Sequence, residues 1–154
     1  MSTFEELAAT AGGPFDHRAH VHVTWLAVRE VGMPAAIALV SEGLRRTARY
    51  AGAPQKYHET MSRAWVLLVA HHVAQDPAVD FPAFARRNPA LLDKRLLSRF
   101  YRSSTLAAAA ARAGWVEPDR APFPSEAGQP VQLRLAQLEA EPFVEPVRGR
   151  PGRA

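Results

Sequence analysis

The chain has 154 residues, 47% of them hydrophobic, which suits a single globular domain with its own core. It has no cysteine, which excludes disulfides, thiolate metal ligands and a cysteine nucleophile, so any site must use His, Asp, Glu or Tyr. Its 19 basic and 15 acidic residues give a net charge of +4, but the basic residues form only short pairs, not the dense stripe typical of a nucleic-acid face.

The sequence also lacks the signals of export or membrane insertion. No run approaches the apolar length of a membrane span. The first residues include Glu5 and Glu6, where a signal peptide has basic residues followed by an apolar run. We therefore predict a cytoplasmic protein with no membrane and no nucleic acid among its partners.

Glycine, proline and capping residues divide the chain into predicted helices. Residues 1–14 are predicted to be a flexible lead-in, in which residues 5–11 could form a short helix that Gly12-Gly13-Pro14 ends. Asp16 is a good N-cap for the helix that follows. Gly32 and Gly52 mark the next two breaks. The predicted helices cover residues 17–31, 34–50, 55–74, 89–101 and 105–113, with a short one after Asp80.

These elements predict an all-α fold, a bundle of about five or six helices over residues 15–126. The composition changes beyond Trp115, where seven of the thirteen prolines lie. Residues 127–154 are predicted to be a proline-rich extension whose last residues are disordered.

Three of the six histidines are predicted to meet at one end of this bundle. Short connections favour antiparallel neighbours, which places the starts of the first and third helices at the same end. His17 and His20 lie in the first turn of one helix, and His58 lies in the first turn of the other. His22 falls on the flank of its helix and is predicted to face away.

We predict that these three histidines bind one metal ion. The positive potential at helix N-termini keeps imidazole neutral, and neutral imidazole is the metal-binding form. Side chains three apart on a helix are neighbours, so His17 and His20 could ligate one ion, with His58 as the third ligand. The cofactor would be one divalent or redox transition metal, with Cu, Fe, Zn and Ni not distinguished.

Residues near the histidines are assigned roles toward a small-molecule substrate. Tyr57 is the predicted catalytic residue, as a hydrogen-bond partner or proton donor. Lys56 and Arg63 lie near helix ends that could hold an anionic group. Trp25 is predicted mainly to be a core residue and secondarily to form one wall of the pocket. The predicted substrate-binding residues are Lys56, Thr60, Trp25 and Arg63.

Two other interpretations of the histidines stay open. An H-x-x-H pair can simply hydrogen-bond to backbone or water, so the histidines could be purely structural. They could also line a polar pocket that holds no metal. Both alternatives use the same residues and differ from the metal site in what occupies the ring nitrogens.

Several motifs together resemble a known group of proteins. They are Phe15-x-His17-x-x-His20, Lys56-Tyr57-His58-x-Thr60 with Trp65, Asn88-Pro89 with Leu91-Leu92, and Val116-Glu117-Pro118-Asp119 with Pro122 and Pro124. Over roughly residues 15–124 the chain resembles a group of small helical bacterial proteins of unassigned function. The resemblance implies no activity. It implies that the matched histidines belong to one site and that Glu117-Pro118-Asp119 is part of the folded unit.

The sequence thus predicts a small metal-dependent enzyme that acts on a small organic molecule through His17, His20 and His58. The metal would act as a Lewis acid or lower the pKa of bound water. The alternative is a non-catalytic small-molecule binding or protein-interaction module whose histidines line a metal-free pocket. A homodimer is left open, because the sequence does not fix the oligomeric state.

Overall fold

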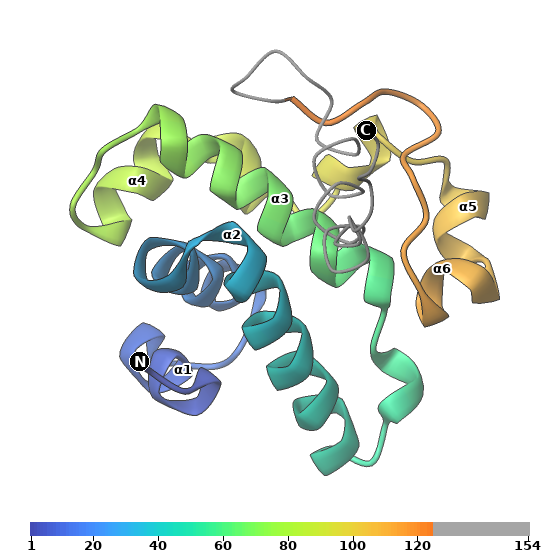
Figure 1. Cartoon of the computed structure of the whole chain (residues 1–154), viewed down its shortest axis with the longest axis horizontal. Helices are drawn as coiled ribbons and strands as arrows, with labels where there is room; N and C mark the ends of the chain where they lie inside the picture. Colours follow the sequence, from blue (N-terminus) through green and yellow to red (C-terminus); the bar gives the residue numbers. More distant parts are fainter. Residues whose placement is uncertain (125–154) are drawn as a thin grey trace, which may run out of the picture.

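A computed structural model describes residues 1–124 (Figure 1). Within this range the fold is all-α, as predicted, with six α-helices, three 3-10 turns and no strand. The elements are α1 (Phe4–Ala11), α2 (His17–Tyr50), η1 (Pro54–Lys56), α3 (Glu59–Gln75), α4 (Phe81–Arg87), η2 (Pro89–Leu92), η3 (Leu96–Arg99), α5 (Ser103–Ala107) and α6 (Ala109–Ala113). The predicted extension over residues 127–154 lies outside the described residues.

The long helix α2 consists of two helices that meet at Gly32. Gly32 has φ of 82° and ψ of 169°, a conformation that glycine adopts readily and other residues avoid. Asp16 caps the start of α2 as predicted, because its carboxylate accepts a hydrogen bond from the Ala19 amide at 2.9 Å. The predicted break and the predicted cap are therefore both confirmed.

By length and apolar content α2 reaches the dimensions of a membrane span, and it is the one helix in residues 1–124 that does so. No such run was expected from the sequence, because Gly32 divides this stretch into two shorter helices. Val21, Val23 and Val40 of α2 are completely buried in the folded domain, and 33% of the span is buried.

The core forms where α2 packs along α3, with α1 against α2 and α6 against α3. Phe81 and Phe84 of α4 join this core through Trp25. Val66 and Val69 of α3 are fully buried. The first half of α2 buries more than one face, since Val23 and Trp25 are as buried as Val21. The second buried face results from the contacts of Trp25 with Phe81 and Phe84 of α4.

Residues 4–11 form α1 rather than a loose lead-in. Thr3 and Glu6 make a reciprocal capping box, in which each side chain accepts a hydrogen bond from the other residue's backbone amide. Phe4 and Leu7 are each 5% exposed and belong to the core. The N-terminal stretch is therefore held by both a local cap and tertiary burial.

Two predicted helices are each divided in the structure. Residues 89–101 form the separate turns η2 and η3, because Asp93 is extended and accepts a hydrogen bond from the Arg95 amide at 2.9 Å. Such a local side-chain bond competes with the helical backbone pattern. The alanine-rich run divides into α5 and α6 at Ala108, which has extended backbone angles.

The segment after α6 returns along α5 and α6 and packs on the fold (Figure 1). Tyr101 donates a hydrogen bond to the Val116 carbonyl at 2.6 Å, and Phe123 is only 2% exposed. The Asp119 carboxylate accepts hydrogen bonds from the Arg102 amide and the Thr105 hydroxyl. Glu117-Pro118-Asp119 therefore belongs to the folded unit.

The docking of α1 on α2 gives a first prediction, at Gly43. A Cβ atom at this position would overlap the ring of Phe4, which is buried and cannot swing into solvent without loss of its packing. In a helix, Gly to Ala normally stabilises by up to about 1 kcal/mol. We expect Gly43→Ala instead to lower the free energy of unfolding by about 1–3 kcal/mol in urea titrations.

The double variant Gly43→Ala with Phe4→Ala is the control for this prediction. Removal of the ring also removes the overlap, so Gly43→Ala should then be neutral or stabilising in the Phe4→Ala background. An equal destabilisation in both backgrounds would contradict the packing of Phe4 against Gly43.

Candidate functional site

The histidines predicted to share a site line one pocket of about 600 Å³. The pocket lies where α2 begins, where its second half ends and where α3 begins. Its size falls in the roughly 300–1,000 Å³ range of small-molecule sites. The lining residues are Phe15, His17, His20, Leu44, Thr47, Ala48, Ala51, Ala53, Lys56, Tyr57, His58, Met61, Ser62, Trp65 and Lys94.

Chain reversals bring these residues together. The bend at Gly32 returns the chain, so that Thr47, Ala48 and Ala51 of the second half of α2 line the same pocket as His17. The short turn η1 then leads directly into α3. One site thus receives residues from the starts of the first and third helical segments and from the end of the second, as expected of antiparallel neighbours.

His17 is anchored to a neighbouring element through one ring nitrogen. Its Nε2 lies 2.9 Å from the Leu91 carbonyl of η2, so Nε2 carries the proton and donates it. The ring also meets the edge of Trp65, with the ring centroids 4.6 Å apart. His17 therefore retains Nδ1 as an acceptor, while its orientation is fixed by η2 and α3.

His20 lies among aromatic rings and has a buried polar atom without a partner. Phe15 and Trp65 lie 6.2 and 6.5 Å from its ring centroid, and its Nε2 makes no hydrogen bond with the residues that the structure describes. Burial, and secondarily the charge of His17, lowers the pKa of His20 to about 4. Its imidazole is therefore neutral at pH 7.

His58 uses both of its ring nitrogens in hydrogen bonds to the backbone. Nδ1 accepts a bond from the Met61 amide at 3.1 Å, which makes His58 the N-cap of α3. Nε2 donates to the Leu106 carbonyl of α5 at 2.7 Å. The prediction that His58 lies inside a helix beginning near residue 55 is thus corrected, because the helix begins at Glu59 with His58 as its cap.

The three histidines share the pocket but do not form a three-ligand set in this conformation. A metal ligand needs a free lone pair on nitrogen, and the His58 Nδ1 lone pair accepts a backbone hydrogen bond. Over residues 1–124 no group of three or more His, Asp or Glu side chains is placed to hold a metal ion. The geometry therefore fits a pocket lining better than a metal centre.

Tyr57 lines the pocket, but its hydroxyl donates to Glu59 Oε1 at 2.7 Å. Arg45 and Arg63 also bind this carboxylate, at 3.0 and 2.6 Å. Burial raises the pKa of Tyr57, and the bond to Glu59 raises it further. For Glu59, burial acts upward, but the bonds from Tyr57 and Arg63 prevail and the pKa is lowered. The Tyr57 hydroxyl therefore keeps its proton and donates it in the hydrogen bond to the ionised Glu59.

Three of the residues predicted to bind substrate do not line the pocket. Trp25 packs in the core against Phe81, with centroids 5.7 Å apart, and Arg63 pairs with Glu59. Thr60 is fully buried, and its hydroxyl bridges the chain after α6 by donating to Gly114 O at 2.6 Å and accepting from the Val116 amide at 3.1 Å.

His22 lies outside the pocket lining, on the flank of α2. It stacks on Phe81 of α4 with centroids 4.1 Å apart and an interplanar angle of 6°. Burial, followed by the charge of Arg18, lowers its pKa. His20 and His22 are thus two residues apart in sequence, but His20 lines the pocket and His22 packs on α4.

Lys56 lines the pocket as predicted, and Lys94 is a lining residue that sequence reasoning missed. They are the only two lysines of the chain. Neither makes an ion pair or hydrogen bond with residues 1–124, and no Asp or Glu is among the residues that line the pocket. Lys94 has no spacing relation to the histidines, but the rarity of lysine was a signal that could have drawn attention to it.

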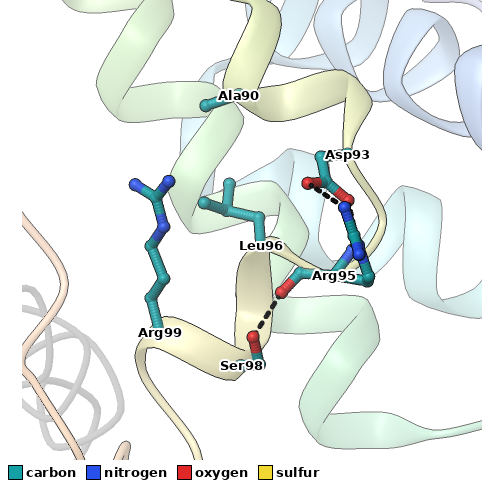
Figure 2. A pocket seen from close by; sticks show the side chains of 6 residues that line it. All are labelled: Ala90, Asp93, Arg95, Leu96, Ser98 and Arg99. Carbon is teal, nitrogen blue, oxygen red and sulfur yellow. Dashed lines mark hydrogen bonds and ion pairs between the residues drawn. The ribbon is translucent and has the colours of Figure 1, made fainter.

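A second hollow, of about 220 Å³, lies between η2 and η3 (Figure 2). Leu96 lies between the Asp93–Arg95 pair and the side chain of Arg99. The polar groups largely satisfy one another, since Arg95 binds Asp93 at 3.2 Å and Ser98 donates to the Arg95 carbonyl at 2.7 Å. This hollow is therefore a weaker candidate than the histidine pocket.

Comparisons with protein-family models, with curated proteins and with solved structures found no match for this chain. The residues and geometry of the pocket are therefore the features from which a function can be inferred.

The neutral state of His20 predicts how stability depends on pH. The unfolded chain binds a proton with a pKa near 6.5, whereas the folded protein binds it only near 4. The free energy of unfolding should therefore be unaffected above about pH 6.5 and fall as the pH drops from 6.5 toward 4, by about 1–3 kcal/mol. Denaturation of wild type and His20→Gln at several pH values measures this contribution of His20 to the free energy of unfolding. A difference in unfolding free energy between the two proteins that stays constant from pH 7 to pH 4 would contradict the prediction.

The Thr60 bridge gives a matched pair of substitutions. Thr60→Val keeps the side-chain shape but leaves the Val116 amide without its acceptor, so we expect a loss of about 1–3 kcal/mol in the free energy of unfolding. Thr24 is equally buried, but its hydroxyl donates only to the His20 carbonyl of its own helix. Thr24→Val should cost clearly less in the same titration, and equal losses would contradict a bridging role for Thr60.

Proposed function

We propose that this protein binds a small organic molecule in the histidine pocket, with His17, His20 and His58 acting as a metal-free lining. The observation that carries the proposal is the bonding of His58. Both of its ring nitrogens serve the backbone, through Met61 N and Leu106 O, so the residue shapes the pocket wall without offering a lone pair.

The composition of the lining supports the same proposal. Leu44, Met61 and Trp65 give apolar surface, while Ser62 and the neutral His20 give polar groups beside it. Small-molecule sites combine mostly apolar walls with a few polar groups that orient the ligand. The hydroxyl of Tyr57 is engaged by Glu59, so the proposal assigns it no proton transfer.

Isothermal titration calorimetry with small naphthalene compounds tests the proposal. We expect saturable binding at one site per chain, and we expect Ala48→Phe to abolish it, because Ala48 lines the pocket and a phenyl ring would occupy the space. Ala38→Phe, at an exposed position of the same helix outside the lining, is the control and should bind as wild type does. Absent or unsaturable binding, or binding that survives Ala48→Phe, would contradict the proposal.

A metal-dependent enzyme is the second candidate. The rings of His17 and His20 are neighbours, with centroids 6.1 Å apart, and a neutral imidazole such as that of His20 is suited to bind Zn, Cu, Fe or Ni. For His58 to join them as a ligand, it would have to give up the bond from the Met61 amide, and ligation through Nε2 would cost the bond to Leu106 as well.

Metal analysis decides between the two candidates. Purified protein supplied with Fe, Cu, Zn and Ni in turn should retain none of them near one per chain, as measured by plasma mass spectrometry. Stoichiometric metal that is lost in His20→Ala and kept in His22→Ala would instead establish the metal site. His22 is the matched control because it stacks on Phe81 outside the pocket.

A further inference from the structure

We infer that the ligand of the histidine pocket is a small organic anion with a flat apolar body, whose charged group is met by Lys56 and Lys94. The inference rests on the proposed function, because it names the chemical class that the pocket takes. The evidence for it is the positive charge of the pocket lining and the apolar surface beside that charge.

The fixed charges of the pocket lining are all positive. Lys56 comes from η1 and Lys94 from the connection between η2 and η3, two parts of the chain far apart in sequence. Asp93 and Glu59 lie beside lining residues, but each carboxylate is bound by arginine, Asp93 by Arg95 and Glu59 by Arg63. Asp16 lies with Lys94 in an adjoining hollow, where its carboxylate caps α2 through the Ala19 amide. Within residues 1–124, no carboxylate lines the pocket itself or pairs with either lysine, so an anion in the pocket can neutralise them.

The other groups around the pocket do not offset this charge. The starts of α2 and α3 carry positive potential, and the end of α2 at Ala51 carries negative potential, so the helix termini leave a net positive potential. His20 is neutral at pH 7, and the Tyr57 hydroxyl keeps its proton. The potential inside the pocket is therefore positive, and the two ammonium groups supply its full charges.

The apolar part of the lining favours a flat ring system as the body of the anion. Phe15 is a large apolar residue that remains 41% exposed although its ring contacts those of Phe4 and His20. Trp65 also lines the pocket, where its ring is fixed against His17 and is only 3% exposed. A flat ligand that covers the Phe15 ring would remove that exposed surface from water, which is the favourable term for apolar burial.

The test compares ligands that share a ring and differ in charge. By calorimetry with the full chain at low salt, 2-naphthoate and 2-naphthyl phosphate should bind at least about tenfold more tightly than neutral 2-naphthamide or cationic 2-naphthylmethylamine. The advantage of the anions should shrink in 0.5 M NaCl, because the lysines are exposed and their charges are screened. Whichever anion binds more tightly identifies the preferred charged group.

Lysine substitutions locate the source of the preference. Lys56→Met and Lys94→Met should each weaken 2-naphthoate binding about fivefold, and the double variant should bind it no better than 2-naphthamide. Arg86→Met removes one positive charge from an exposed position of α4 outside the pocket, so it should leave the affinity unchanged.

The outcomes separate this inference from the proposed function. If naphthalene ligands of every charge bind equally, or if the double lysine variant keeps the anion preference, the inference is overturned while the binding pocket stands. If no compound binds, or if Ala48→Phe does not block binding, the proposed function itself fails.

Discussion

The candidate site depends on the two hydrogen bonds that the His58 imidazole makes with the backbone. The imidazole accepts from the Met61 amide and donates to the Leu106 carbonyl, so one side chain starts α3 and attaches α5 to that start. A histidine can do both only as the neutral Nε2–H tautomer, with one nitrogen as acceptor and the other as donor. The same ring lines the pocket, so the hydrogen bonds that join α3 to α5 also fix part of the pocket wall.

Local signals in the sequence predicted much of the fold. Asp16 as a cap and Gly32 as a break depend on backbone preferences of single residues, and such preferences act without knowledge of the tertiary structure. The division of residues 89–101 was missed because an Asp93 side chain in a local turn looks the same in sequence as one on a helix surface. The helix α1 was expected only as a possible short helix in a flexible lead-in, because its capping box precedes only a short apolar pattern.

The candidate site could be predicted only in part, for a related reason. Alternation of short connections and helices was enough to place His17, His20 and His58 together. It could not show that His58 caps a helix, nor that Thr60 faces the returning chain, because both facts depend on tertiary partners at Leu106, Gly114 and Val116. Residues distant in sequence decide whether a histidine nitrogen is free to bind a metal or is engaged by a backbone group. The local sequence motif is the same in both cases.

The aromatic contact between Phe4 and Phe15 joins the N-terminal helix to the mouth of the pocket, with the ring centroids 5.9 Å apart. If the pocket takes the ligand proposed above, docking of α1 and occupation of the pocket are thermodynamically linked, and the linkage is reciprocal. A ligand that held Phe15 in place would also hold α1 on α2, and a change that displaced residues 4–11 would weaken ligand binding. Residues 4–11 would in this sense be a remote part of the proposed site.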